Sequence, residues 1–330
     1  MKPGRRRDAT LIAIGAIVVT ILACVSPSAA VAAFPGANGR IAYVSVEDEL
    51  VDEHTFAPRG DIVTVLPDGS GRQELTDGPA SEGGPSWSAD GRRLVFSRAP
   101  GELGHQLFMM NADGSGQSQI TEGPDSALSP SFAPHGRRVV FVKNRRSIWT
   151  IRTDGTDSRR LVGAGQRDGI ASPQYSPNGR RIVFAGVPKN RSREGIWTMR
   201  RDGSGLRRLT KPTQDEIDGD PDHSPDGRHI AFVRGDASFG GFQPHLMRAD
   251  GSRERPIPGT FLSTAPAYAP AGDRIALATE TTRGFPFCAN IFTISPSGSD
   301  RQVVTHNCDP QGQSFPSASS PSWQPLPGPE

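Results

Sequence analysis

The sequence predicts an all-β fold, a six-bladed β-propeller of four-stranded antiparallel blades in which the C-terminal strand completes the first blade. A phrase of the type PSWSADGRRLVF recurs along the chain, and its turn glycines are spaced 43 to 52 residues apart. The 38 Gly and 30 Pro of the 330 residues indicate many turns between short strands. One further copy of the phrase is divided between the two ends of the chain.

Each repeat holds four short strands, which we name A to D in chain order. The phrase above supplies strands A and B, which are joined by a tight turn such as S-A-D-G-R. A second phrase supplies strands C and D through a turn such as A-D-G-S-G. Both turns place Gly where a positive φ is easiest, and Asp, Asn or Ser where a side chain can bond the local backbone. The A–B copies are 85–96, 130–141, 173–184, 221–232 and 266–277, and the C–D copies are 62–76, 107–121, 148–162, 196–210, 246–257 and 291–304.

A four-stranded unit of this length is typical of a propeller blade. A single blade cannot bury both faces of its sheet, whereas each sheet in a ring packs on two neighbours. The divided copy then explains how the ring closes. Residues 38-NGRIAYV-44 are a strand B without its A, and 321-PSWQPLP-327 are a strand A without its B. Pairing the two protects edges that would otherwise be open to aggregation, and an open solenoid would leave both halves unexplained.

The repeats resemble those of TolB-like β-propellers, which read P-x-W-S-P-D-G-[RK]-x-[IL]-[AV]-F and then I-[YW]-x-M-x-x-D-G-S. The resemblance covers nearly all of residues 35–325. It implies the propeller fold. The domain that precedes the propeller in TolB has no counterpart, because too few residues lie before the first blade. The resemblance therefore does not imply a TolB role in the Tol–Pal system.

Residues 1–33 are predicted to be a signal peptide, and residues 34–330 the propeller. A basic start is followed by an apolar run over 9–25 and by small residues that give an A-x-A-like cleavage site near Ala32 or Ala33. Two alternatives stay open. The apolar run can just span a bilayer as an uncleaved anchor, and 21-ILAC-24 is similar to a lipobox that would lipidate Cys24. Each predicts an extracytoplasmic protein, either secreted or at the cell envelope.

The charge that remains after residues 1–33 is close to balanced, with 33 Lys and Arg against 34 Asp and Glu. A nucleic-acid-binding protein needs a basic surface to neutralise phosphates, so this composition argues against that class. We expect a monomer that contacts a membrane only through its N-terminal segment.

Cys288 and Cys308 are predicted to form a disulfide. Their midpoint is Gly298, which lies in the C–D turn of the last blade, so the two residues face each other across a regular hairpin. A bridge fits an exported protein and would contribute about 3 kcal/mol on the chain-entropy model. The alternative, a metal site that includes His306, lacks a fourth ligand and standard spacing.

No nucleophile elbow, zinc-protease motif, P-loop or dinucleotide fingerprint occurs in the sequence. The richest polar cluster is 214-QDEIDGDPDHSPDG-227, in which His223 replaces the aromatic residue of the other repeats. Its oxygens are a weak candidate for a divalent metal such as calcium, with Asp218, Asp220, Asp222 and His223 as ligands. The alternative is a solvated acidic loop in which His223 fills the aromatic position. We therefore expect no cofactor.

The connections between strands B and C and between D and the next A differ from repeat to repeat, and in a propeller they share one face. The B–C connection of the first blade, 47-EDELVDEHTFAPRG-60, is predicted to be a long acidic loop. Variable loops on a rigid scaffold are where recognition usually occurs. The candidate binding residues on this face are Arg145, Arg146, Lys189, Arg191, Phe242 and Phe285. We predict a non-catalytic scaffold that binds a protein partner at the cell envelope. The alternatives are a metal-assisted polysaccharide lyase or hydrolase acting in the channel, and a carbohydrate- or peptide-binding module.

Overall fold

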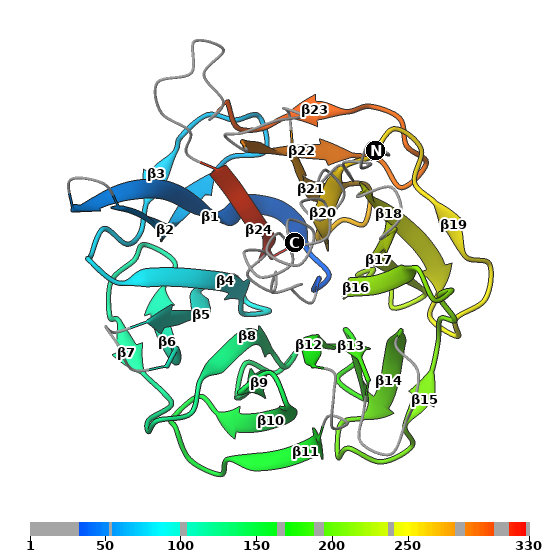
Figure 1. Ribbon diagram of the computed structural model, residues 1–330, viewed down its shortest axis with the longest axis horizontal. Coiled ribbons are helices and arrows are strands. Elements are labelled where there is room, and N and C mark those ends of the chain that lie inside the picture. Colours follow the sequence, from blue (N-terminus) through cyan, green and yellow to red (C-terminus); the bar gives the residue numbers. More distant parts are fainter. Residues whose placement is uncertain are drawn as a thin grey trace, which may run out of the picture.

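The computed structural model forms a ring of six β-sheets around a central axis, and each sheet has four antiparallel strands (Figure 1). This confirms the predicted six-bladed β-propeller. Among the described residues, no helix is long and apolar enough to cross a membrane. The structure describes residues 33–52, 55–99, 104–163, 169–187, 195–236, 241–280, 288–306 and 317–327.

Blades 1 to 6 follow the chain, and in every blade the innermost strand A is followed outward by B, C and D. The strands of blades 1 to 3 are β24 (Ser317–Leu326), β1 (Ala37–Asp52), β2 (Thr55–Val65) and β3 (Gln73–Glu74); β4 (Ser81–Trp87), β5 (Arg93–Ala99), β6 (Gln106–Asn111) and β7 (Ser118–Gln119); β8 (Ala127–Phe132), β9 (Arg138–Lys143), β10 (Ser147–Arg152) and β11 (Arg159–Gly163). Those of blades 4 to 6 are β12 (Ile170–Tyr175), β13 (Arg181–Gly186), β14 (Ile196–Arg200) and β15 (Arg207–Arg208); β16 (Glu216–His223), β17 (His229–Asp236), β18 (Gly241–Arg248) and β19 (Arg255–Pro256); β20 (Ser263–Tyr268), β21 (Ile275–Glu280), β22 (Ala289–Ile294) and β23 (Gln302–Val303).

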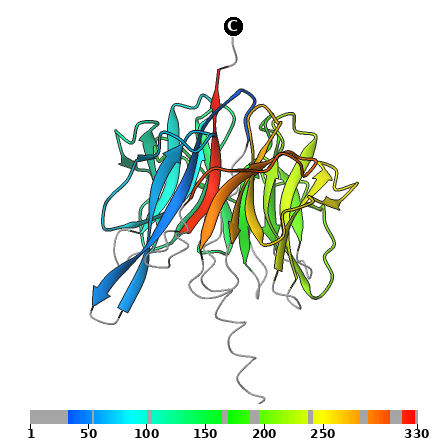
Figure 2. The same cartoon turned by 90° about the horizontal axis from the view of Figure 1, so that it is seen from above.

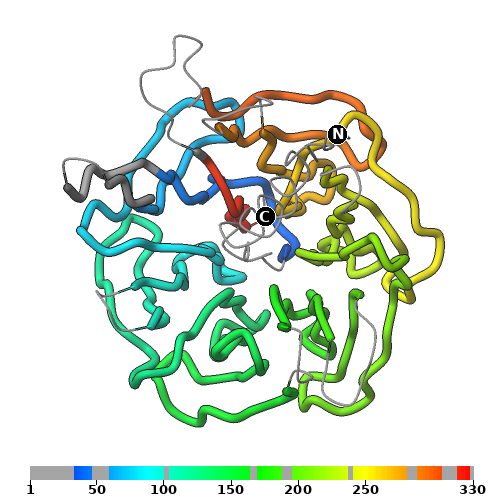
Figure 3. Tube along the Cα trace, viewed as in Figure 1, coloured from blue at the N-terminus to red at the C-terminus, as the bar shows by residue number. Residues whose placement is uncertain are grey.

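The ring closes where β24 pairs antiparallel with β1, as the divided repeat predicts (Figure 3). Ile41 lies opposite Trp323 in this pairing. Trp323 is 3% exposed and packs in one core with Tyr43 of blade 1 and Ala267 of blade 6. The last strand therefore joins the first and last blades through backbone pairing and through a shared hydrophobic core.

Side chains on both sides reinforce this seam. The Gln324 Nε2 atom donates to the Gly91 carbonyl at 2.8 Å, and the Gln324 Oε1 atom accepts from the Arg40 amide at 3.2 Å. On the other side, Asn38 Nδ2 donates to Asp273 Oδ1 at 3.0 Å. Blade 1 is thus tied through its termini to blades 2 and 6.

The two kinds of repeated turn form as predicted. Gly91, in an A–B turn, has φ 66°, and Gly114, in a C–D turn, has φ 88°, a region that glycine enters without strain. The Asp113 carboxylate accepts hydrogen bonds from the Ser115 amide at 3.0 Å and from its hydroxyl at 2.7 Å. Local hydrogen bonds of this kind make the turns alike from blade to blade.

An irregularity that the sequence analysis did not predict recurs in strand A of every blade. The residue before the repeated proline has a positive φ, and the pairing register with strand B shifts there. A bulge suits proline because the position needs no ladder hydrogen bond. The residues with positive φ are Gly84, Ser129, Ser172, Asp220, Ala265 and Ser320.

The core lies between the blades. The aromatic residue that follows each bulge is buried against the next or preceding sheet, for example Trp87, which packs with Ile62 of blade 1 and Phe96 of blade 2. His223 occupies this position in blade 5 and is 4% exposed. The equivalent residues are Trp87, Phe132, Tyr175, His223, Tyr268 and Trp323.

The propeller has two faces. The turn face carries the A–B and C–D turns together with the end of β24, and the loop face carries the B–C and D–A connections (Figure 2). On the loop face the structure corrects one expectation. Residues 47–60 are a predicted loop, but β1 continues to Asp52 and pairs with β2 from Thr55 onward. Backbone pairing simply extends beyond the sheet, so this segment is a projecting hairpin.

Trp323→Ala should lower the free energy of unfolding by about 3–5 kcal/mol, because it opens a cavity between the first and last blades. Urea unfolding followed by fluorescence measures this loss. Trp149→Ala is the control, since Trp149 is only partly buried on the outer part of blade 3. An equal loss of unfolding free energy in the two variants would show that the seam contributes no more to stability than a partly buried position elsewhere.

Candidate functional site

A cavity of about 270 Å³ opens on the loop face beside the inner strands of blades 3, 4 and 5. Ser129, Ala171 and Gly219 belong to the inner strands of these three blades, and Arg145 borders the cavity from the turn between β9 and β10. The Ser129 hydroxyl is buried and has no hydrogen-bond partner among the described residues. One predicted binding residue, Arg145, therefore lies at the edge of a largely apolar cavity beside the inner strands.

Arg145 is held in a strained conformation. Asn144 and Arg145 both have φ 53°, and the Arg146 amide donates to the Lys143 carbonyl at 3.0 Å, so these residues form a tight hairpin turn with two positive φ values. Arginine enters this region at a cost and remains there only when its surroundings fix it.

Hydrogen bonds to neighbouring residues hold the turn in place. The Asn144 side chain accepts from the Ser126 amide at 2.7 Å, and the Arg145 carbonyl accepts from the Ile170 amide of blade 4 at 3.1 Å. The guanidinium group is exposed, and no ion pair or hydrogen bond of this group occurs within the described residues. The backbone of Arg145 is therefore fixed by its neighbours, while its guanidinium group is exposed to solvent.

Of the other predicted basic residues, Arg146 is exposed like Arg145. The neighbouring Lys143 is engaged, because its Nζ atom lies 2.9 Å from Asp125 and 4.9 Å from the centre of the Trp149 ring. Lys189 and Arg191 lie outside the described residues.

Of the predicted phenylalanines, Phe242 is partly buried at the start of β18, and its carbonyl accepts from the Leu262 amide at 2.8 Å. Phe285 lies outside the described residues. The structure adds Phe261, which is 52% exposed in the connection between blades 5 and 6. Sequence reasoning missed it because the predicted phenylalanines, Phe242 and Phe285, belong to B–C connections, whereas Phe261 lies in a D–A connection after P-G-T.

The acidic cluster of blade 5 does not form a common site. Asp218 makes a two-pronged ion pair with Arg234 at 2.7 and 2.9 Å. The pair has an equivalent in blade 2, where Glu82 contacts Arg98 at 2.6 Å. The ion pair is therefore a structural feature within a blade, and Arg234 neutralises the Asp218 carboxylate.

Asp220 and Asp222 point to different neighbours. Asp220 is the residue of the bulge, and its Oδ1 atom accepts from the Ser172 hydroxyl of blade 4 at 2.8 Å. Asp222 accepts from the Tyr268 amide of blade 6 at 2.6 Å. Burial raises the pKa of Asp220 to about 6, although the Ser172 hydroxyl opposes the shift.

His223 fills the aromatic position of blade 5, and both ring nitrogens are without a hydrogen-bond partner in the described part of the chain. Burial lowers its pKa to about 4, so the ring is neutral at pH 7. Within the described ranges, no group of three or more His, Cys, Asp or Glu side chains is placed to hold a metal ion. The predicted ligands Asp218, Asp220, Asp222 and His223 thus have separate surroundings.

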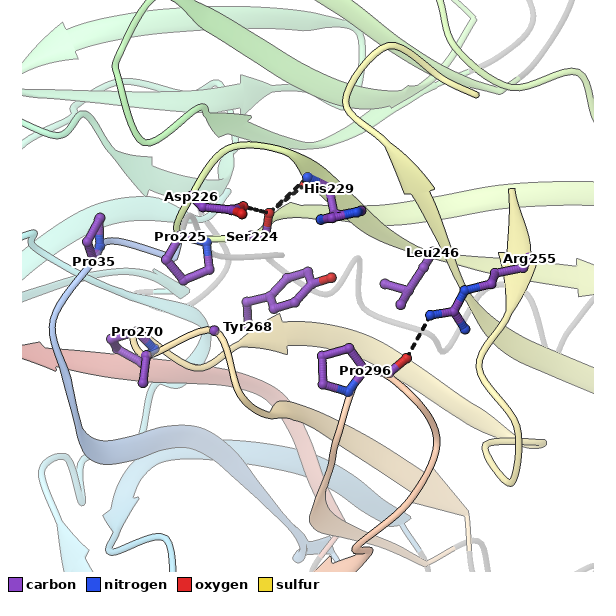
Figure 4. Close-up of a pocket in the computed structure, with 12 residues that line it drawn as sticks. Pro35, Ser224, Pro225, Asp226, His229, Leu246, Arg255, Tyr268, Pro270 and Pro296 are labelled. Atoms are coloured by element: carbon purple, nitrogen blue, oxygen red, sulfur yellow. Dashed lines mark hydrogen bonds between the residues drawn. The ribbon is translucent and has the colours of Figure 1, made fainter. Parts of the chain in front are cut away.

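Larger cavities lie on the turn face. One of about 550 Å³ lies between blades 5 and 6 and is lined by Pro225, Tyr268 and Gly272 (Figure 4). A second, of about 520 Å³, lies between blades 3 and 4. Its residues Pro134, Tyr175 and Gly179 hold the same positions in the repeat. Because the repeat itself creates these cavities, their size does not mark a specialised site.

Cys288 is fully buried. Cys308 lies outside the described residues, so the bridge stays a prediction. The described hairpin pairs Phe292 with Val303, which is one residue away from the register assumed in the sequence analysis. The Ile291 carbonyl then accepts from the amides of both Val304 and Thr305, at 2.9 and 3.1 Å.

Known proteins with the same architecture define the family. A family profile described as "TolB beta propeller domain" matches residues 97–325. The chain belongs to this TolB β-propeller family. No curated protein matches the sequence.

Solved structures share the fold of this TolB-family chain. TolB from Acinetobacter baumannii is 18% identical with a TM-score of 0.68, over 87% of this chain and 67% of that one. A putative TolB from Agrobacterium tumefaciens is 16% identical with a TM-score of 0.61, over 87% and 100%. A hydrazine synthase from Kuenenia stuttgartiensis is 14% identical with a TM-score of 0.65, over 88% and 47%. At these identities the likeness extends to the fold alone.

Asp220→Ser should stabilise the protein above pH 6, by about 2 kcal/mol, and have little effect near pH 4. The pKa of Asp220 is raised in the folded state, so the unfolded chain loses its proton first and a rising pH favours unfolding. Serine holds the same position in blades 1, 3 and 4. Urea unfolding from pH 4 to pH 8 measures the effect, with Asp215→Ser, at an exposed residue of the same cluster, as control. A difference that does not change with pH would contradict this account.

Proposed function

We propose that this chain is an exported, non-catalytic propeller scaffold that binds a protein partner at the bacterial cell envelope through its loop face. The single observation that carries the proposal is Arg145, an exposed arginine in a strained turn at the edge of a largely apolar cavity. Strain at a position fixed by its neighbours is a feature of functional sites. On the opposite face Arg253 is likewise exposed and has φ 57°, but it lies in a C–D turn, at a position where the other blades also have a positive φ.

The chemistry of the site indicates an acidic partner surface. Arg145 and Arg146 present two exposed guanidinium groups, and such groups bind carboxylates through paired hydrogen bonds. The inner wall of the cavity supplies the unpartnered Ser129 hydroxyl. The exposed ring of Phe261 supplies an apolar contact elsewhere on the loop face. Arginine and aromatic residues are enriched among those that dominate binding energy at protein interfaces.

The location at the cell envelope belongs to the same proposal. It is supported by the basic, apolar and small-residue order of the predicted signal peptide. The family supports the scaffold role, since a TolB-type propeller without a catalytic motif is suited to binding.

The Arg145→Glu, Arg146→Glu double variant should lose the partner in a pull-down from an envelope extract of the source bacterium. The matched control is Arg137→Glu, which reverses an exposed charge of the same blade on the turn face. Reversing a charge at the interface places like charges together and should weaken capture at least tenfold. Circular dichroism verifies that each variant is folded.

A partner lost with Arg137→Glu and kept with the double variant would move the binding site to the turn face and contradict the proposal. Each pull-down is repeated with a chelator. Capture that requires a divalent metal would instead favour the alternative of a metal-dependent activity in the channel.

A further inference from the structure

Ala33 and Phe34 belong to no blade, yet they are among the most buried residues, at 4% and 2% exposed. Phe34 packs with Val95 and Phe132, in the core between blades 2 and 3. Ala33 packs with Tyr268, in the core between blades 5 and 6. These two cores lie on opposite sides of a six-bladed ring, so the dipeptide crosses its central channel. Figure 3 shows the chain entering β1 from the middle of the ring.

The amide of Ala33 meets a buried carboxylate. Asp222 is fully buried, its Oδ2 atom accepts from the Tyr268 amide at 2.6 Å, and the backbone amides of Ala33 and His223 also lie close to the carboxylate. Its Oδ1 atom has no hydrogen-bond partner, and no ion pair of Asp222 with Lys, Arg or His occurs within the described residues. Burial raises the pKa of Asp222 well above its usual range. A buried carboxylate without a cation is costly, which suggests that a positive charge belongs here.

The sequence can supply that charge at the position of Ala33. The residues Ala30-Val31-Ala32 form the predicted A-x-A-like cleavage site. Hydrolysis of the Ala32–Ala33 peptide bond by a leader peptidase takes up one water. It leaves a carboxylate on Ala32 and frees the α-amine of Ala33, which is largely protonated at neutral pH. An amide offers one proton, whereas an ammonium group offers three and can also reach the unpartnered oxygen.

We propose that the leader is cleaved after Ala32, and that the new ammonium group of Ala33 forms a buried ion pair with Asp222 of blade 5. This ion pair links removal of the leader to the stability of the closed ring. The proposal rests on the export included in the proposed function, but it requires no partner.

The alternatives at the N-terminus do not satisfy Asp222 in this way. Cleavage after Ala33 would make Phe34 the first residue and remove a hydrogen-bond donor from the carboxylate. Lipidation at Cys24 or an uncleaved anchor would leave the Ala33 nitrogen as a neutral amide. Only one cleavage position places a cation at the carboxylate.

The other titratable groups near Ala33 come from blades 5 and 6. They are His223 beside Asp222, Tyr268, and Asp226, His229 and Arg255 in the adjoining cavity next to Pro35 (Figure 4). Burial raises the pKa of Tyr268 well above its usual value, and burial lowers that of His223 to about 4. Neither group changes its charge between pH 7.5 and pH 10 to any large extent, so the α-amine dominates this window.

The first experiment exports the full chain with its own leader from a bacterial host and determines the N-terminus by Edman sequencing and intact mass. The expected sequence is Ala33-Phe34-Pro35. A start at Phe34, at a lipidated Cys24 or at Met1 would overturn the proposal. Export without any binding partner leaves this result valid, so it is independent of the proposed loop-face interaction.

The second experiment compares the mature protein with a chain that carries one extra glycine before Ala33, each with and without Asp222→Asn. The ion pair raises the pKa of the α-amine, so its stabilisation is complete below the unfolded value near 8 and is lost as the pH rises through the folded value. The mature protein should therefore lose about 5 °C of melting temperature between pH 8 and pH 10. The other three proteins should lack this step.

A third measurement covers the case in which Asp222→Asn does not fold. An amine-reactive acylating reagent is applied to the mature protein, folded and in urea, and the modified N-terminal peptide is quantified. The α-amine should react at least tenfold more slowly in the folded state. Equal rates, or identical pH profiles in all the folded proteins above, would overturn the ion pair.

Discussion

The antiparallel pairing of β24 with β1 is the constraint on which the rest of the structure depends. It turns a linear array of repeats into a ring, and it places Trp323 between the first blade and the last. Every hydrophobic core lies between sheets, so each blade needs two neighbours, and closure gives the end blades their second neighbour. The central channel, the two faces and the crossing of the channel by Ala33 and Phe34 all follow from this closure.

Within the ring, features that repeat build the scaffold, and departures from the repeat create chemistry. The turns, the bulges before proline and the aromatic positions are shared by the blades. Asp222 and His223 depart from the repeat in blade 5, where a buried acid lies beside a neutral imidazole. Arg145 departs in blade 3, where an exposed charge is fixed on the loop face. Propellers vary function in this way without altering their architecture.

The fold could be predicted because its determinants are local. A turn such as that at Gly91 depends on residues next to it in the sequence, and the divided repeat predicts directly that the last strand pairs with the first blade. The site depends instead on which residues become neighbours. The strain at Arg145, the pairing of Asp218 with Arg234 and the contact of Ala33 with Asp222 are set by the geometry of adjacent strands and blades. The sequence could identify most of these residues, but it could not show which of them contact one another.

Hydrogen exchange of the amides of β1 and β24 tests the central role of closure most directly. If the seam holds the ring together, these amides should exchange only through global unfolding, with the same free energy and denaturant dependence as those of β13 and β14 in the opposite blade. If β24 instead exchanges through a separate opening of lower free energy while β13 and β14 stay protected, the ring does not depend on its closing strand, and this account of the fold is wrong.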